Sequence, residues 1–336
     1  MTKLVFATQQ LDAAHPTLGA AADMVKALAS RFDEVVVLAS SADEPALPAN
    51  VRFRSFAAPV QALRGLRFEA GLARELAGGR PTGFLAHMSP VYAMLAAPLL
   101  RPLRVPVLLW FTQQRAGGRL RRAERVVDAI LTVDARSVPL ASSKVRAIGH
   151  GIDTALFECA PGREGSLRLL SLGRYAEVKG HDVAVRALAS LPEAELVVCG
   201  EEATPNDARV RARLGELARG TRTQLLDGVP RSQVPAVLVE ADVLVNATHG
   251  ASADKVVFEA LAACVPVVAA SPVFDGLLPP ALRFADGDSE DLARAVRAAA
   301  ALPADERRRL RARVEAEHSV GHWADEVAAA VRLARK

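Results

Sequence analysis

Short apolar runs alternate with amphipathic segments along the second half of the chain. The runs are apolar on both faces, and the stretches between them, such as HDVAVRALASL, repeat their apolar positions with a helical period. The apolar runs cover residues 167–173, 194–200, 223–228, 242–247 and 266–271. Strands that are buried on both faces and alternate with helices are typical of a parallel sheet covered on both sides. The pattern therefore predicts a doubly wound α/β domain.

The first half repeats this pattern less regularly. Its candidate strands are KLVFAT, EVVVLA, VRFRSF, GFLAH, VPVLLW, AILTV and KVRAIG, and helical patterns such as LGAAADMVKALASRF follow most of them. The periodicity lapses in residues 149–166, where glycine, proline and charged residues collect, as is usual between domains. We therefore predict two Rossmann-like doubly wound domains, residues 1–152 and 153–318, that face each other across a cleft, and a further helix in residues 319–336.

The composition is that of a globular protein with two substantial cores. The chain has 336 residues, of which 51% are hydrophobic and 24% charged, and this is about twice the length of a typical domain. The apolar run at the start is too short for a secretory signal, and no run reaches the ~18 apolar residues of a membrane span. These features predict a soluble, cytoplasmic protein.

The three cysteines, Cys159, Cys199 and Cys264, are far apart in the sequence and form no Cys-x-x-Cys or Cys/His cluster. Such a pattern indicates neither a disulfide framework nor a zinc site. We interpret all three as small core residues.

The formal net charge of +4 conceals an uneven distribution. Residues 52–136 contain fourteen arginines, no lysine and five acidic residues, so this stretch carries +9 and the rest of the chain −5. A basic surface attracts anionic substrates, acidic membranes or nucleic acid. Nucleic acid fits poorly, because residues 115–125 have no aromatic side chain among their arginines to stack on bases. A weak peripheral contact with the inner face of a membrane, through Arg101, Arg104 and residues 115–125, is a hypothesis, and a solvated helix face is the alternative.

The loops that follow the strands are the places to search for chemistry, because ligands of open parallel sheets bind beyond the carboxyl ends of the strands. After the first strand, Gly19 opens a helix whose free N–H groups suit an anion, and a simple tight turn is the alternative. Gly173 ends a strand of the second half, and Arg174 and Lys179 follow it. Two cations at a strand end suit a diphosphate, although the same pattern also occurs as ordinary surface charge.

The stretch DKVVFEALAAC, residues 254–264, places a carboxylate in an otherwise apolar helix. Lys255 and Val256 lie in the first turn of this helix, where free N–H groups carry a partial positive charge. Glu259 lies one turn further along, and a buried carboxylate needs a partner. That partner is a ligand hydroxyl or, as the structural alternative, Lys255 four residues earlier.

The segments GRYAEVKG, ADVLVNAT, DKVVFEALAACVPVVAA and GHGIDTALF together resemble a retaining glycosyltransferase of the GT4 family, also called glycosyltransferase group 1. The resemblance covers nearly the whole chain and is strongest in residues 144–285. It implies the GT-B fold, with two Rossmann-like domains and a C-terminal helix that crosses back to the first domain. It also implies that Arg174 and Lys179 contact the donor diphosphate and that Glu259 holds the ribose of the nucleotide. His87, in FLAHMSP, matches the histidine that lies near the transferred sugar.

The sequence departs from the family pattern in several loops. Ala251 stands where the family has the first of two glutamates, the one that contacts the sugar, and Asp254 is a candidate substitute for it. Gln113 stands where many relatives have a histidine, and Gly19 is not followed by a second glycine. Ala251 and Gln113 support an alternative function, that of a noncatalytic nucleotide-sugar-binding or partner subunit.

We predict a metal-independent, retaining transferase that moves a hexose-type sugar from a nucleoside diphosphate, UDP or GDP, to an acceptor, with no cofactor. No Asp-x-Asp motif stands at a strand end to hold Mg²⁺, so the cations and the helix start carry the leaving-group charge in this prediction. A nucleotide-sugar epimerase or a hydrolase is a less favoured alternative. The base, the sugar, the acceptor and the oligomeric state stay open at this point.

Overall fold

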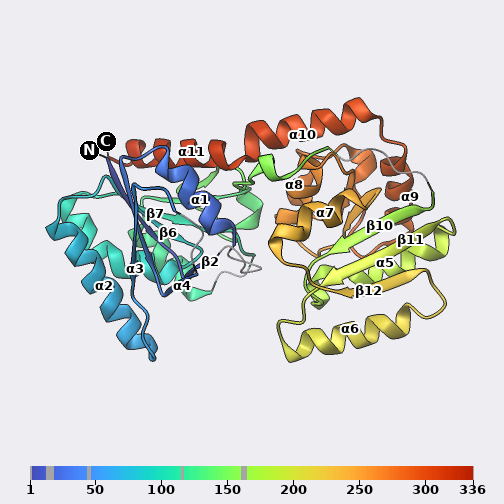
Figure 1. Ribbon diagram of the computed structural model, residues 1–336, viewed down its shortest axis with the longest axis horizontal. Helices are drawn as coiled ribbons and strands as arrows, with labels where there is room; N and C mark the ends of the chain where they lie inside the picture. Colours follow the sequence, from blue (N-terminus) through green and yellow to red (C-terminus); the bar gives the residue numbers. More distant parts are fainter. Residues whose placement is uncertain (1, 13–18, 44–46, 115–116, 160–164, 336) are drawn as a thin grey trace. The chain divides into compact units, whose positions relative to one another are not determined.

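The computed structural model describes residues 2–12, 19–43, 47–114, 117–159 and 165–335 (Figure 1). Its elements form two compact units, Met1–Asp153 with Glu317–Lys336 and Thr154–Ala316. Each unit has its own parallel sheet with helices packed against it, which confirms the predicted α/β class with two Rossmann-like domains.

Among the described residues of the first unit, seven parallel strands form a sheet in the order β5-β3-β1-β6-β7-β8-β9. Their bounds are β1 Lys3–Ala7, β3 Glu34–Ala39, β5 Val51–Ser55, β6 Gly83–His87, β7 Val107–Trp110, β8 Ala129–Thr132 and β9 Val145–Ala147. Every residue of β1 is buried, and Val5 lies opposite Val36 of β3 and Phe84 of β6. All seven strands coincide with predicted apolar runs. The separate parallel pair β2 Gln10–Asp12 and β4 Ser41–Asp43 does not, because three residues are too few to show a period.

In the described part of the first unit, five α-helices pack together. They are α1 Ala20–Ala29, α2 Gln61–Ala77, α3 Pro90–Leu100, α4 Gly118–Val126 and α11 Val320–Leu333, with the 3-10 turns η1 Arg101–Leu103 and η2 Ala135–Ser137. Figure 1 shows α11, the last helix, beside α1. Trp323 of α11 meets Trp110 of β7 edge to face, with 5.7 Å between ring centroids, and both side chains are buried. The C-terminal helix is therefore part of the core of the first unit.

Gly149 and Gly151 precede the boundary between the two units at Asp153, and they lie against Glu317 and His318, which lead into α11. Gly149 has a φ of 78°, and a Cβ there would lie 2.0 Å from the carbonyl oxygen of Glu317, so no side chain fits. The N–H groups of Gly151 and Ile152 donate to the carbonyl oxygen of His318 at 3.0 and 2.8 Å. The motif GHGI thus fixes where the C-terminal segment rejoins the first unit.

In the second unit, five parallel strands of the described chain form a sheet in the order β12-β11-β10-β13-β14. Their bounds are β10 Leu167–Leu172, β11 Ala194–Gly200, β12 Thr223–Asp227, β13 Val243–Asn246 and β14 Val267–Ala269. The helices are α5 His181–Ala187, α6 Pro205–Leu217, α7 Val234–Val239, α8 Lys255–Ala262, α9 Ser289–Ala300 and α10 Ala304–His318. The 3-10 turns are η3 Thr154–Leu156, η4 Glu177–Lys179, η5 Leu188–Ser190, η6 Arg231–Gln233, η7 Pro272–Phe274 and η8 Pro280–Leu282. Each strand lies within one of the five predicted apolar runs.

The structure corrects the interpretation of the cysteines. Cys159 and Cys264, 105 residues apart, form a disulfide with a Cα–Cα distance of 4.8 Å, which is within the usual range for such bonds. Cys199 is free and buried, as predicted for a core residue. Sequence spacing could not show this disulfide, because the fold alone brings the segment after η3 to the turn that follows α8.

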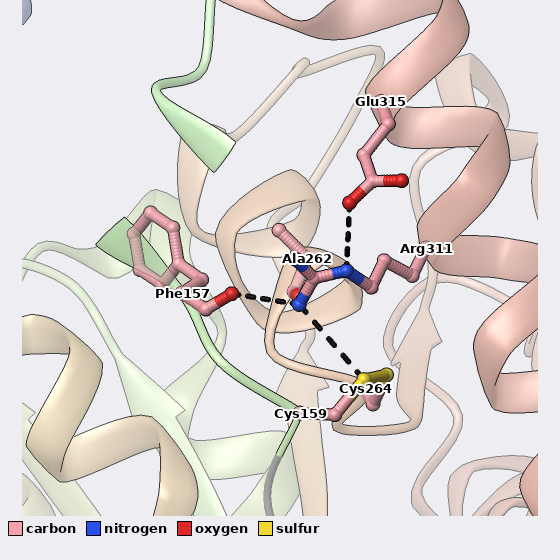
Figure 2. The surroundings of a disulfide bond; sticks show 6 residues. All are labelled: Phe157, Cys159, Ala262, Cys264, Arg311 and Glu315. Carbon is pink, nitrogen blue, oxygen red and sulfur yellow. Dashed lines mark hydrogen bonds and ion pairs between the residues drawn. A yellow bond between two sulfur atoms is a disulfide. The ribbon is translucent and has the colours of Figure 1, made fainter. Parts of the chain in front are cut away.

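Figure 2 shows that Arg311 of α10 joins the two chain segments of the disulfide. Its guanidinium donates to the carbonyl oxygens of Phe157, at 2.7 Å, and of Ala262, the last residue of α8. Its Nη1 also lies 3.8 Å from the sulfur of Cys159, and its Nε donates to Glu315 at 2.7 Å. One side chain and one disulfide therefore tie the end of α8 to the segment at the start of the second unit.

Candidate functional site

Strands β10 and β13 are neighbours in the second sheet, and the loops that follow them carry most of the predicted donor residues. Because the strands are parallel, their carboxyl ends lie at the same edge of the sheet. The loop after β10 contains Gly173, Arg174 and Lys179, and the loop after β13 leads through Asp254 into α8. The structure therefore brings these predicted residues to one edge of one sheet.

Two further glycines allow a close approach of the backbone at this edge. Gly180 has a φ of 60°, and a Cβ there would lie 2.2 Å from the carbonyl oxygen of Ala247. A Cβ on Gly200, the last residue of β11, would lie 2.0 Å from the carbonyl oxygen of Gly173. Neither distance leaves room for a side chain, so the packing of these loops depends on glycine at both positions.

Lys179 and Asp254 form the central contact between the two loops. The Lys179 ammonium lies 2.8 Å from Oδ1 of Asp254, and Ser252 Oγ donates to the same oxygen at 2.8 Å. Asn246 Nδ2 donates to Oδ2 at 2.9 Å, and so does the hydroxyl of Thr248. The sequence pattern did not indicate these three neutral donors. The one available signal is that Asn246 is a polar residue at the end of an otherwise apolar strand.

The Asp254 carboxylate stays ionised despite its burial. Burial raises its pKa, but the charge and hydrogen bond of Lys179 and the hydrogen bonds from Thr248 and Asn246 lower it by more. The net pKa of Asp254 is therefore far below its usual range. The site holds a fixed negative charge beside the lysine predicted to bind phosphate.

Glu259 lies inside α8, as predicted, and is only 5% exposed. Its Oε1 lies 3.7 Å from the ammonium of Lys255, which is the predicted structural alternative but is longer than a hydrogen bond. Among the described residues, none donates a hydrogen bond to the Glu259 carboxylate. Lys255 and Val256 form the first turn of α8, the end of the helix that carries a partial positive charge. A nearly buried carboxylate and a helix start thus lie one turn apart.

Arg174 follows Gly173 and points its guanidinium toward α6. Its Nη1 lies 3.4 Å from Oδ2 of Asp207, and its side chain is 45% exposed. Asp207 is itself buried and caps α6, where it accepts hydrogen bonds from the N–H groups of Ala203 and Thr204. The second predicted cation therefore also has an acidic partner, in a more open setting than Lys179.

His181 supports the loop that carries both cations, and sequence analysis did not single it out. Its Nδ1 lies 2.8 Å from Oγ of Ser171, and its Nε2 lies 3.0 Å from the carbonyl oxygen of Arg174. Burial lowers the pKa of His181, and hydrogen bonds to backbone oxygen only partly offset this. A neutral, buried imidazole thus holds the backbone at Arg174.

The other two predicted site residues, His87 and Gly19, belong to the first unit. His87 ends β6 and is buried, with its Nδ1 3.2 Å from the hydroxyl of Thr8 and its ring 5.4 Å from that of Phe6. Met88, directly after it, has a φ of 57°, which is unusual for a side chain of this size. Gly19 precedes α1 with ordinary helical angles, so the backbone does not require a glycine there. Residues 13–18 of the predicted anion loop lie outside the described residues.

Ala251 and Gln113 lie where the sequence departs from the family pattern. Ala251 is half-buried in the loop before α8, and Gln113 is exposed after β7. Neither supplies a carboxylate or an imidazole. Within the part of the chain that the structure describes, no three histidine, cysteine or acidic side chains cluster as metal ligands, and no helix has the length and apolarity to cross a membrane.

Residues 160–316, almost the whole second unit, match the family model described as glycosyl transferases group 1. This match confirms the predicted family resemblance for that range. A D-inositol 3-phosphate glycosyltransferase of Mycolicibacterium gilvum is 31% identical over 154 residues, 42% of this chain and 34% of the relative. The corresponding protein of Mycobacterium leprae is 32% identical over 168 residues, 48% of this chain and 32% of the relative. The chain thus spans about a third of the length of these curated relatives.

Solved structures resemble the whole chain. Sucrose-phosphate synthase from Thermosynechococcus elongatus superposes with a TM-score of 0.80 at 16% identity, over 99% of both chains. The Anabaena protein HepE, solved in complex with UDP-glucose, has a TM-score of 0.76 at 16% identity, over 99% of this chain and 100% of that one. At such identities the likeness shows the fold, and the chain has the GT-B fold of these proteins.

Proposed function

We propose that this protein is a glycosyltransferase that moves a sugar from a nucleoside diphosphate to an acceptor, with retention of configuration and without a metal ion. The observation that carries the proposal is Glu259, a nearly buried carboxylate with no hydrogen-bond donor among the described residues, one turn from the start of α8. The ion pair with Lys255, at 3.7 Å, leaves this carboxylate without a hydrogen bond, and ligand hydroxyls supply one. The group 1 match over residues 160–316 supports the same conclusion.

In the proposed donor complex, the second unit holds the nucleotide. Glu259 accepts hydrogen bonds from the ribose hydroxyls, and the N–H groups of Lys255 and Val256 point at the diphosphate. Lys179 and Arg174 supply positive charge from the neighbouring loop, Arg174 after exchanging Asp207 for a phosphate oxygen. Charge that develops on the departing diphosphate meets preorganised donors, which is the largest single source of stabilisation in many enzymes. These groups take the part that a metal ion plays elsewhere, and this is the basis for proposing metal independence.

Retention follows, in this proposal, from transfer on one face of the sugar. The bond between the anomeric carbon and the phosphate oxygen breaks, and the acceptor oxygen bonds to the same face of that carbon. The proton of the acceptor hydroxyl passes to the departing phosphate, so the step needs no protein base. His87 positions the sugar or the acceptor from the first unit.

We propose UDP as the first donor nucleotide to test, and GDP as the second, because HepE shares the fold and has been solved with UDP-glucose. The identity with the inositol phosphate enzymes spans about a third of their length, so it assigns no acceptor here. We also propose a cytoplasmic protein with weak contact to an acidic membrane surface. That contact rests on exposed Arg101 and Arg104, which flank Leu103, 43% exposed, in η1.

A noncatalytic nucleotide-sugar-binding subunit is the second candidate. Ala251 brings no carboxylate to the loop before α8, and both oxygens of Asp254 are already occupied by protein donors. Such a subunit binds the donor as the transferase does. The two functions therefore differ in whether nucleotide is released when acceptors are added.

The first test is thermal stabilisation by UDP, GDP, ADP and TDP and their sugars, with and without EDTA. A nucleotide at ~100 times its Kd stabilises the fold by ~2.7 kcal/mol, which a melting curve resolves. We expect one nucleotide to raise the Tm equally with and without EDTA, and Glu259→Ala and Arg174→Ala to abolish the shift. Glu216→Gln, on the exposed face of α6, is the control and should keep it. If no nucleotide shifts the wild-type protein, the proposed function is wrong.

A further inference from the structure

Asp254 accepts four hydrogen bonds within the second unit, two on each of its carboxylate oxygens. Oδ1 accepts from Lys179 and Ser252, and Oδ2 accepts from Asn246 and Thr248. An ionised carboxylate has about four acceptor sites. All of them are filled by the protein, so Asp254 has no acceptor left for a sugar hydroxyl.

The Lys179 ammonium, by contrast, still has N–H groups to donate to a ligand. Its ammonium has three N–H groups, and the described residues take one of them, through Asp254. Its stem lies over Gly173, where a Cβ would be 3.5 Å from Cδ and Cε. A lysine stem is otherwise flexible, so the position of this ammonium is set at its end by Asp254. The side chains are 21% and 11% exposed, so solvent screens the pair less than it does a surface pair.

The three neutral donors in turn fix Asp254. Asn246 ends β13, Thr248 lies two residues beyond it, and Ser252 lies in the loop that leads to α8. The Asn246 amide is oriented by this contact, because the reversed amide would place its oxygen against the Asp254 carboxylate. The carboxylate is thereby anchored to the sheet on one side and to the start of α8 on the other.

From this geometry we infer that Asp254 is a positioning residue of the donor site and contacts no sugar. It holds the Lys179 ammonium at the start of α8, so that the two remaining N–H groups meet the diphosphate of the bound nucleotide. The inference rests on the proposed function. It replaces the prediction that Asp254 substitutes for the missing glutamate at Ala251.

A double-mutant cycle tests the inference, because a residue that acts through Lys179 has nothing to act on when Lys179 is replaced. Affinities for the nucleoside diphosphate and for the nucleoside alone are measured by calorimetry for wild type, Asp254→Asn, Lys179→Met and the double variant. We expect Asp254→Asn to weaken diphosphate binding about tenfold in the wild-type background and less than about twofold in the Lys179→Met background. Nucleoside affinity should stay unchanged throughout.

Two other variants distinguish a specific loss of diphosphate binding from a loss caused by misfolding. Asp254→Glu keeps the charge but moves it by one methylene, and it should also weaken diphosphate binding only when Lys179 is present. Glu216→Gln, exposed on α6 and outside the Asp254 network, is the control, and its diphosphate affinity should stay within about twofold of wild type.

The outcomes separate the inference from the proposed function. An equal loss from Asp254→Asn in both backgrounds would mean that Asp254 only ties the loop, and tighter diphosphate binding would mean that it competes with the ligand. Either result overturns the inference but leaves the donor site intact. Failure of the wild-type protein to bind any nucleoside diphosphate overturns the proposed function as well.

Discussion

Lys179 and Arg174 both hold a carboxylate of the protein, but the two pairs differ in exposure. The Lys179–Asp254 pair is short and mostly buried, whereas Arg174 lies 3.4 Å from Asp207 and is 45% exposed. Exposed ion pairs contribute about 0 to 1 kcal/mol. In the proposed donor complex Arg174 can therefore leave Asp207, whose carboxylate keeps its hydrogen bonds from the N–H groups of Ala203 and Thr204, whereas Lys179 meets the diphosphate from a fixed position.

His181 gives a prediction about pH at the scale of one residue. Burial lowers its pKa in the folded state below the ordinary value of about 6.5. As the pH falls through that value the unfolded chain takes up a proton first, so stability that is present above pH ~6.5 is lost below it. We expect wild type to lose more unfolding free energy than His181→Gln between about pH 7.5 and 5, measured by urea unfolding at each pH. Parallel losses in the two proteins would contradict the assignment.

The site residues differ in how far the sequence alone could predict them. Glu259 stands out because a carboxylate interrupts an apolar helical run, and that signal is local. The role of Asp254 depends on a lysine 75 residues earlier, and no local pattern reveals such a contact. His181 and Asn246 were missed for the same reason, since their partners are set by the packing of strand ends. Short-range periodicity predicts elements, and it does not predict which loop ends meet.

At the scale of elements, the strands were the most predictable part of the fold. Both sheets are parallel and covered by helices, so central strands such as β1 and β7 are continuous apolar runs that are easily recognised. The edge strands β5, β9 and β12 contain exposed polar residues and give a weaker signal. The pair β2 and β4 lacks that signal, and so does the disulfide. The turn after α8 also carries Cys264 at a φ of 58°, a conformation that sequence spacing cannot foresee.

The disulfide between Cys159 and Cys264 gives a prediction about stability. It closes a loop of 105 residues, and in the chain-entropy model a loop of about this length contributes ~4.7 kcal/mol, with measured values typically ~2 to 4. We expect a dithiol reductant to lower the unfolding free energy of the wild-type protein by about 2 to 4 kcal/mol in urea titrations.

The matched variant is Cys159→Ser, which cannot form the bond. It should unfold at the same urea concentration with and without reductant, close to the reduced wild-type protein. Arg311 still joins Phe157 to Ala262 in both, so the fold itself should persist. If thiol titration shows complete reduction and the wild-type midpoint does not move, the bond contributes nothing to the stability of the folded chain.

At the scale of the molecule, charge is divided between two regions of the chain. Residues 52–136 carry +9 and the remainder −5, and residues 52–136 lie entirely in the first unit. On α4, Leu120 and Ala123 face the core, while four arginines are exposed. The exposed arginines are Arg119, Arg121, Arg122 and Arg125. The helix is therefore amphipathic, with a basic outer face, and the proposed donor residues of the second unit lie outside this basic stretch.

This division predicts contact with anionic membranes through the first unit. An arginine near an acidic lipid surface contributes about 1 kcal/mol, so replacing Arg119, Arg122 and Arg125 by glutamine should weaken partition onto anionic vesicles by a factor of order 10². Replacing Arg209, Arg213 and Arg219, exposed on or just after α6, changes the net charge equally and is the control. Flotation at low salt should recover wild type and the control with the vesicles but not the α4 variant, and high salt should release all three because charge is screened.

If both variants float alike, net charge alone draws the protein to the vesicle. If wild type does not float even at low salt, the first unit has no membrane role, and its basic face is then available to steer an anionic acceptor.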